Sequence, residues 1–263
     1  MPIGPFELEI LQLLAKHRNP ESHIGGATVL NQDDGSPRAS EDIDVFHDTV
    51  EALKISFDLD CTQLSAHGYE MKTQILGEHF RRALIRKGEH STKLEWVYDT
   101  AFRFFPVEPD VELGYRLNYW DAATNKILAG AGRAQPRDYV DMIHMHQHRL
   151  SLGALIWAAA GKDEGLSPSF IIEEMSRVQR YRYEQFGKLK LHEKPDLPAL
   201  KQIWIEALHQ ARQLVNETLL EAPLGCLFLN DSREPVTPTA ENWSTLQPHF
   251  GSVRGAWPRV VEE

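Results

Sequence analysis

Residues 24–46 read IGGATVLNQDDGSPRASEDIDVF, and this stretch decides the fold. A short apolar run leads into the glycine pair Gly25-Gly26, which is a turn signal. A polar segment rich in turn-forming residues follows at positions 31–40. Residues 42–46 then alternate carboxylate and apolar side chains, which predicts a strand with two different faces.

The predicted strand would present Asp42 and Asp44 on one face, because residues two apart on a strand share a face. Two adjacent carboxylates repel each other unless a cation lies between them. Mg²⁺ prefers such oxygen ligands and usually keeps water and substrate phosphates as its others. The Gly25-Gly26 turn lets backbone approach phosphate closely, and a helix start behind it adds amide donors. These residues predict a site that holds a nucleoside triphosphate for in-line displacement.

The segments around this stretch predict an α+β fold, a mixed sheet with flanking helices followed by a mainly helical C-terminal region. We place the boundary between two domains at 118/119, giving domains 1–118 and 119–263. In the first domain the pattern predicts helices at 5–17, 27–30 and 49–60, strands at 21–26, 69–76, 77–86 and 92–104, and a loop at 106–114. In the second it predicts helices at 121–132, 136–150, 152–160, 168–186 and 197–220 and a late strand at 224–229.

Composition limits the classes of function. The net charge of −10 argues mildly against broad binding of nucleic acid, so any such contact is expected to be local. The longest apolar stretch, residues 152–160, is too short to span a bilayer. Two cysteines fit a reducing compartment, and we expect a cytoplasmic protein without a disulfide framework.

Two blocks of the sequence resemble a known superfamily. Gly25-Gly26, a spacer and Asp42-x-Asp44 resemble the nucleotidyltransferases related to DNA polymerase β. The string Arg38-x-Ser40-x-Asp42-Ile-Asp-Val-Phe is similar to the AbiEii-like branch, which contains toxins of toxin–antitoxin systems. A second block agrees with that branch, running from Asp121 through Asn125-Lys126 and Arg133 to Arg137-Asp138-x-x-Asp141. The resemblance covers residues 20–145.

The resemblance implies roles for further residues. A third carboxylate is expected on a neighbouring strand, and Glu95 fits best, with Asp99 as the alternative. A glutamate here departs from the more usual aspartate. Lys126 would contact the triphosphate. The alternative is that it is an ordinary exposed lysine on a helix. Arg38 and Ser40 would contact phosphate. For Asp138 and Asp141, helix-bracing ion pairs with neighbouring cations are favoured.

The function implied is transfer of a nucleoside monophosphate from an NTP to an acceptor, with release of pyrophosphate and with Mg²⁺ or Mn²⁺ as cofactor. The resemblance makes an RNA end, such as that of tRNA, a reasonable acceptor, with protein hydroxyls and small molecules such as aminoglycosides as alternatives, and a separate antitoxin would be the protein partner. The alternative is a catalytically inactive module of the same fold that binds nucleotide or protein.

Two other patterns remain as weaker candidates. His144, His146 and His148 would suit a metal hydrolase on a strand, but on a helix only two of them share a face. Residues 177–183 combine arginines with tyrosines, which would suit either an RNA-stacking patch or a solvated helix face with core tyrosines.

Overall fold

The computed structural model describes residues 3–32, 35–40, 42–133, 135–177 and 181–258. The chain divides into two compact units, each with its own core. The first, here the sheet unit, comprises Met1–Ala101 and Pro106–Ala122. The second, the helical unit, comprises Phe102–Phe105 and Ala123–Glu263. The division into domains 1–118 and 119–263 stays a prediction.

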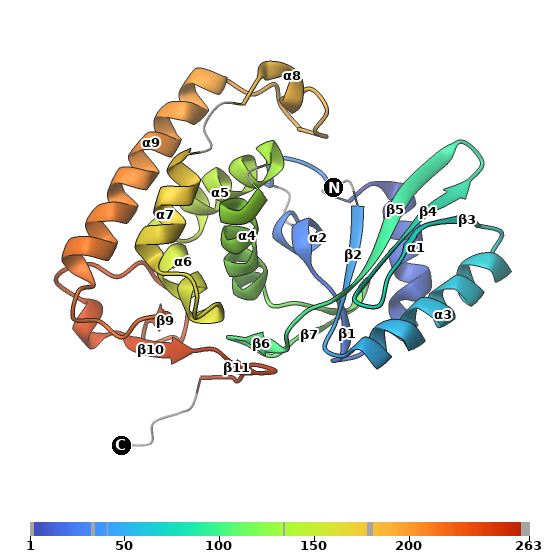
Figure 1. The fold of residues 1–263 in the computed structure, drawn as a ribbon, viewed down its shortest axis with the longest axis horizontal. Helices are drawn as coiled ribbons and strands as arrows, with labels where there is room; N and C mark the ends of the chain where they lie inside the picture. Colours follow the sequence, from blue (N-terminus) through green and yellow to red (C-terminus); the bar gives the residue numbers. More distant parts are fainter. Residues whose placement is uncertain (1–2, 33–34, 41, 134, 178–180, 259–263) are drawn as a thin grey trace. The chain divides into compact units, whose positions relative to one another are not determined.

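The sheet unit is built on a seven-stranded mixed sheet in the order β3-β4-β5-β2-β1-β8-β7 (Figure 1). Its central pair, β2 and β5, is parallel, whereas β1–β2, β3–β4, β4–β5 and β7–β8 are antiparallel. The α+β class and the mixed sheet predicted from the sequence are therefore confirmed. The strands are β1 (Ser22–Ile24), β2 (Asp42–His47), β3 (Glu70–Leu76), β4 (Phe80–Lys87), β5 (His90–Tyr98), β7 (Glu108–Asp110) and β8 (Gly114–Arg116).

Helices α1 (Pro5–Leu14) and α3 (Val50–Ala66) pack on one face of this sheet. Side-chain alternation explains which face they cover. In β5 the buried residues are Thr92, Leu94 and Trp96, and the ring of Trp96 packs edge-on against Phe57 of α3. Thr49 begins α3 by accepting a hydrogen bond from the Ala52 amide at 3.0 Å. The intervening residues of β5 lie on the opposite face of the sheet.

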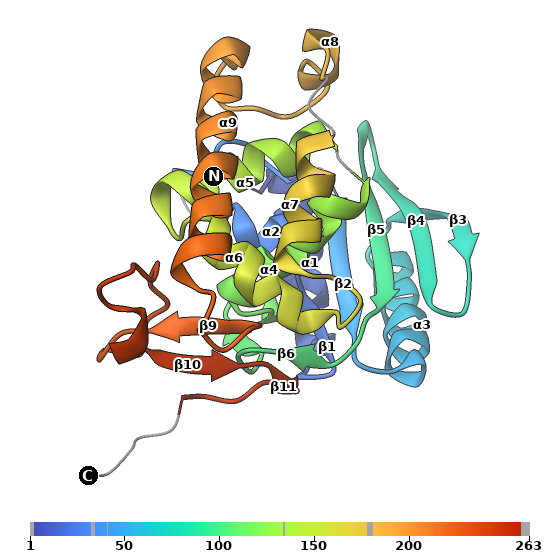
Figure 2. The same cartoon turned by 60° about the vertical axis from the view of Figure 1, so that its left-hand side comes forward.

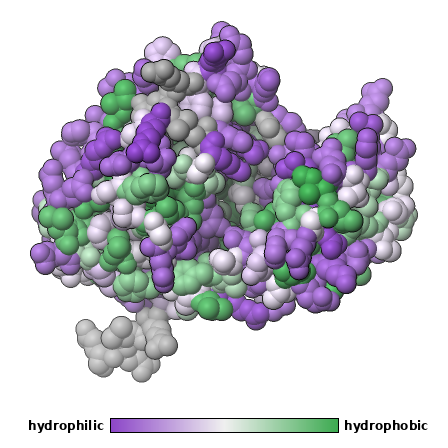
Figure 3. Space-filling model, in the orientation of Figure 1, coloured by the Kyte–Doolittle hydropathy of each residue, from purple (hydrophilic) through white to green (hydrophobic). Residues whose placement is uncertain are grey.

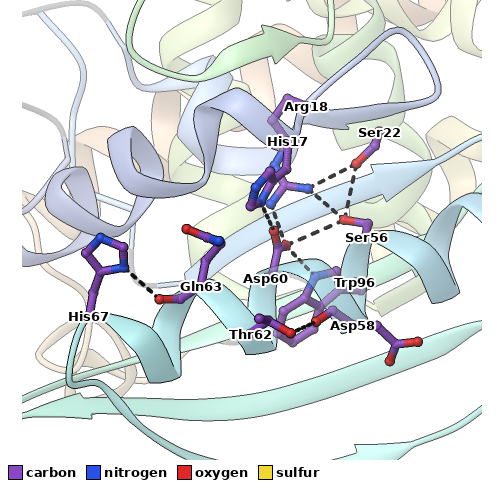
Figure 4. Close-up of polar contacts among 10 residues, drawn as sticks. All are labelled: His17, Arg18, Ser22, Ser56, Asp58, Asp60, Thr62, Gln63, His67 and Trp96. Carbon is purple, nitrogen blue, oxygen red and sulfur yellow. Dashed lines mark hydrogen bonds and ion pairs between the residues drawn. The ribbon is translucent and has the colours of Figure 1, made fainter.

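A buried polar cluster lies between α3 and the sheet (Figure 4). The carboxylate of Asp60 forms an ion pair with Arg18 and accepts a hydrogen bond from Trp96 Nε1 at 2.9 Å. Arg18 also donates to the hydroxyls of Ser22, at 3.0 Å, and Ser56, at 2.7 Å. Burial opposes the ionisation of Asp60, but the Arg18 charge and these hydrogen bonds hold its pKa below the usual value. The cluster links the start of β1 to α3 and β5.

The helical unit is arranged around α6, all of whose residues are buried. Helices α5, α7 and α9 pack against it (Figure 2). Two short β-pairs, β9–β10 and β6–β11, complete the unit. The elements are α4 (Tyr119–Arg133), α5 (Pro136–His148), α6 (Leu152–Ala159), α7 (Pro168–Arg177), α8 (Tyr183–Phe186), α9 (Leu197–Gln213), β6 (Phe102–Arg103), β9 (Cys226–Leu229), β10 (Gln247–Phe250) and β11 (Ser252–Val253).

Several predicted elements need correction. The expected strand 92–104 divides into β5, which ends at Tyr98, and β6, which pairs with β11 in a separate sheet. Segment 106–114, expected to be a loop, contains β7 and the first residue of β8. The expected helix 168–186 ends at Arg177, and α8 is a separate turn; positions 178–180 lie outside the described residues. The expected helix 197–220 changes at Leu214 into a π-helical turn that runs to Thr218. In each case the short strand or the helix end involves too few residues to change the periodicity of the sequence.

The surface is mostly hydrophilic on the face drawn in Figure 3, with apolar side chains in small groups. No helix among the described residues is long and apolar enough to cross a membrane.

His47, the last residue of β2, provides a pH test of the sheet core. Burial, with the nearby charge of Arg18, lowers the pKa of His47 to about 4. The unfolded state therefore binds a proton below about pH 6.5 that the folded state binds only near pH 4. The free energy of unfolding should rise by about 3 kcal/mol from this residue as pH increases across that window.

Urea unfolding at a series of pH values measures this dependence. His47→Gln should flatten the slope between these limits, whereas His192→Gln, which changes an exposed histidine, should leave it unchanged. An unaltered slope in His47→Gln would show that other groups carry the dependence.

Candidate active site

The carboxylates predicted from the sequence meet at the centre of the sheet. Asp42 and Asp44 lie on β2, on the face opposite to α1 and α3, because the alternating residues Ile43 and Val45 are buried. In the parallel ladder to β5, Asp42 lies opposite Lys93 and Asp44 lies opposite Glu95. Glu95 therefore shares the face of the two aspartates. Asp99 lies beyond the end of β5, where its carboxylate accepts the amide of Thr100 at 2.8 Å.

Two cations already contact these carboxylates. Lys93 Nζ lies 3.2 Å from Asp42, and Arg82 Nε of β4 donates to Glu95 at 2.7 Å. The side chains of Asp42 and Glu95 are each 14% exposed, so both remain reachable from solvent. The pairing neutralises part of the negative charge that the three carboxylates would otherwise concentrate.

The glycine turn lies against the second aspartate. The Gly25 amide donates to the Asp44 carbonyl at 3.2 Å. Gly26 has a φ of 62°, and a Cβ added to it would lie 2.4 Å from Asp44 Oδ2. Only a residue without a side chain fits there, so the backbone comes close to the carboxylate. Helix α2 (Gly26–Leu30) begins at this glycine.

Ser40 and Arg38 have structural contacts in the loop that enters β2. Ser40 Oγ donates to the Asp42 carbonyl at 2.9 Å and accepts from Thr28 of α2 at 3.3 Å, which joins α2 to the start of β2. Arg38 is only 1% exposed, and its guanidinium donates to the Ala39 carbonyl at 3.2 Å. Their predicted role as phosphate contacts stays a prediction.

Lys126 belongs to the helical unit, where it is buried between two aspartates of α5. Its ammonium lies 3.0 Å from both Asp138 and Asp141. Arg133 makes a two-point contact with Asp138, at 2.9 Å from each nitrogen. Burial opposes ionisation of Asp138, but hydrogen bonding to Arg133 and the charge of Lys126 lower its pKa to about 2. The aspartates thus brace α4 against α5, and triphosphate contact by Lys126 stays a prediction.

The donor chemistry of the sheet site suits a hard divalent cation, since Asp42, Asp44 and Glu95 are oxygen ligands on one face. Among the described residues, however, no group of three or more histidine, cysteine, aspartate or glutamate side chains is gathered as a metal-binding set. Lys93 and Arg82 hold two of the three carboxylates, so a metal would have to replace these partners.

Two histidines of α5 lie side by side. The rings of His144 and His148 pack with their centroids 4.7 Å apart, one helical turn from each other. Burial and the neighbouring His148 lower the pKa of His144. The described residues supply no third ligand beside this pair.

Solved structures with the same fold include three bacterial proteins. JHP933 from Helicobacter pylori has a TM-score of 0.54 and 17% identity, and the match covers 81% of this chain and 92% of that one. A protein of H. pylori proposed to be a nucleotidyltransferase has a TM-score of 0.51, 18% identity and coverages of 81% and 95%. MenT4, a nucleotidyltransferase toxin from Mycobacterium tuberculosis H37Rv, has a TM-score of 0.54, 14% identity and coverages of 80% and 82%.

These likenesses show the fold. No protein-family model matches the sequence, and no curated protein matches it significantly. The predicted nucleotidyltransferase fold is confirmed by the structures.

The contact between Gly26 and Asp44 can be tested by one methyl group. Gly26→Ala should lower the free energy of unfolding by about 1 to 2 kcal/mol, because it forces a left-handed backbone on a residue with a Cβ. It should also displace the Asp44 carboxylate. Chemical denaturation measures the first effect, and Gly35→Ala, whose Cβ meets nothing within 4 Å, is the control. Equal stabilities of the two variants would refute the packing described.

Removal of Lys126 tests the bracing of α4 and α5. Lys126→Met should cost about 3 to 5 kcal/mol of stability, because it removes the buried ammonium that lies between Asp138 and Asp141. Urea unfolding measures the loss. Lys201→Met, at an exposed position of α9, should change stability little. A small effect of Lys126→Met would mean that the ammonium is held for another purpose.

Proposed function

We propose that this chain transfers a nucleoside monophosphate from an NTP to an acceptor hydroxyl and releases pyrophosphate. The observation that carries the proposal is the register of Asp44 opposite Glu95 on parallel strands, with Asp42 on the same face, in a nucleotidyltransferase fold. A structural role alone does not require three carboxylates on one face of a sheet, because like charges at such spacing repel.

Each residue of the site has a distinct role in this reaction. Asp42 and Asp44 hold the divalent cation, Mg²⁺ or Mn²⁺, which when bound supplies charge neutralisation of the phosphates and activation of the attacking oxygen. Gly25 and Gly26 give the phosphates access to backbone beside Asp44. Glu95 completes the carboxylate set or accepts the proton of the acceptor hydroxyl. That oxygen forms a bond to the α-phosphorus as the bond to the β-phosphate oxygen breaks, and pyrophosphate leaves.

We further propose RNA, with tRNA as one form, as the acceptor, and a toxin role held in check by a separate antitoxin protein. The support is the AbiEii-like character of the two sequence blocks and the likeness of fold to a nucleotidyltransferase toxin. We propose a cytoplasmic location, where NTPs and RNA are both available.

The alternatives predict different outcomes in the same preparation. An inactive module would bind nucleotide without transferring it. A histidine-metal hydrolase would purify with stoichiometric zinc or iron and lose it in His144→Ala.

Incubation of the purified chain with Mg²⁺, each α-labelled NTP and total RNA should label RNA. Asp42→Asn and Asp44→Asn should each reduce labelling by on the order of a hundredfold or more, since each removes a ligand of the metal that stabilises the transition state. Asp58→Asn, an exposed aspartate on α3 of the same unit, is the matched control and should keep full activity. Nucleotide binding with no transfer to RNA, protein or small hydroxyl acceptors would overturn the proposal.

A further inference from the structure

Four basic side chains surround Leu84 on the outer face of β3, β4 and β5. The register places Lys93 of β5 and Lys72 of β3 directly to either side of Leu84. Arg82 and Arg86 lie two residues before and after it on β4, on the same face. We call Lys72, Arg82, Arg86 and Lys93, with Leu84 at their centre, the basic face.

The basic face is continuous with the candidate active site. Lys93 lies opposite Asp42, and Arg82 lies opposite Glu95. Two residues of the basic face are therefore direct cross-strand neighbours of the site carboxylates. From there the face extends across β4 to β3, the free edge of the sheet (Figure 2). Helices α1 and α3 pack on the opposite face of the sheet. Among the described residues, therefore, no helix of the sheet unit buries these side chains.

The cations differ in how they are used. Lys93 and Arg82 form ion pairs with site carboxylates. Lys72 and Arg86 are exposed, and no described residue forms an ion pair with either. Glu70 lies opposite Arg86 on the same face without forming an ion pair with it, so the two cations of the outer half outnumber this carboxylate on a chain whose net charge is −10. Local charge of this kind attracts a polyanion to one place instead of to the whole surface.

We propose that the basic face binds the phosphate backbone of a single-stranded RNA whose terminal hydroxyl reaches the carboxylates of β2. This inference rests on the proposed transfer reaction for the acceptor's chemistry. Neighbouring strands are about 4.8 Å apart, and residues two apart on a strand are separated by about 6.8 Å. A flexible strand can bring successive phosphates to cations at such intervals, and half-buried Leu84 with exposed Ile75 offers apolar surface to the bases.

RNA is favoured over an acidic protein because the cations lie in line with the place where an acceptor hydroxyl must arrive. A protein partner bound here would cover the site, and its binding would not depend on the basic residues being arranged in a line toward the carboxylates. Segment 177–183, the other basic and aromatic stretch, belongs to the helical unit, and its residues 178–180 lie outside the described part of the chain.

The test uses binding without NTP, so that it does not depend on catalysis. Fluorescence anisotropy of a labelled single-stranded RNA should show tight, salt-sensitive binding to the wild-type chain. Lys72→Glu combined with Arg86→Glu should weaken binding by about tenfold or more and lower the slope of affinity against salt by roughly 1 for each residue. Neither residue contacts a site carboxylate, but Arg86→Glu sets a glutamate opposite Glu70, so a small loss of stability is expected and urea unfolding must show that the variant remains folded under the binding conditions.

The matched control combines Lys16→Glu with Lys54→Glu, which alters net charge equally at exposed helical positions of the same unit. It should bind RNA as the wild type does. The milder pair Lys72→Gln and Arg86→Gln should show an intermediate loss, which separates charge from any defect in folding. If transfer is absent but the basic-face variant alone loses RNA, the surface stands and the proposed reaction fails.

Three outcomes overturn the inference. The wild-type chain does not bind RNA; the control pair loses as much affinity as the basic-face pair; or a polyglutamate peptide competes as well as RNA of equal charge. The last result would identify an acidic protein as the occupant.

Discussion

The buried ion pair between Arg18 and Asp60 is the interaction on which the sheet unit depends. Both side chains are almost wholly excluded from water, and a lone charge at that depth would be costly. Arg18 and Trp96 both donate to Asp60 Oδ2, and His17 Nδ1 lies 3.5 Å from the other carboxylate oxygen. Because Asp60 belongs to α3 and its partners come from β5 and from the segment before β1, the pair fixes how helix and strands meet. The face that carries the candidate active site is the other side of that arrangement.

This packing explains why the two faces of each central strand carry different side chains. Ile43 and Val45 face the helices, and Asp42 and Asp44 therefore face away from them. The same alternation in β5 directs Trp96 to Asp60 and Glu95 to the opposite face. A shift of one residue in the register would bury the carboxylates and expose the core. The packing of helices on one face of the sheet thus determines where the carboxylates lie on the other face, although the helices and the carboxylates are not in contact.

Much of this could be predicted from local pattern. The alternation of residues 42–46 is long enough to define a strand with two faces, and Gly25-Gly26 marks the turn before it. Pairing between distant segments could not be predicted in this way. Nothing local to Glu95 specifies that it lies opposite Asp44, and nothing local to Arg38 indicates its burial. Strand β7 has three residues, one of them Pro109, which is too short for a period and carries a residue that disfavours strands.

In both units, specific cations pair with carboxylates that are buried or that lie close together. Lys126 lies between Asp138 and Asp141, and Lys93 lies beside Asp42. The difference is exposure. The side chain of Lys126 is 6% exposed and braces two helices, whereas the side chain of Lys93 is 48% exposed and can exchange its partner. In the proposed reaction Asp42 would hold the divalent cation, and Lys93 would then contact an incoming phosphate in place of Asp42. The proposal that an acidic protein brings two polyanionic substrates together thus relies on its exposed ion pairs exchanging while its buried ones do not.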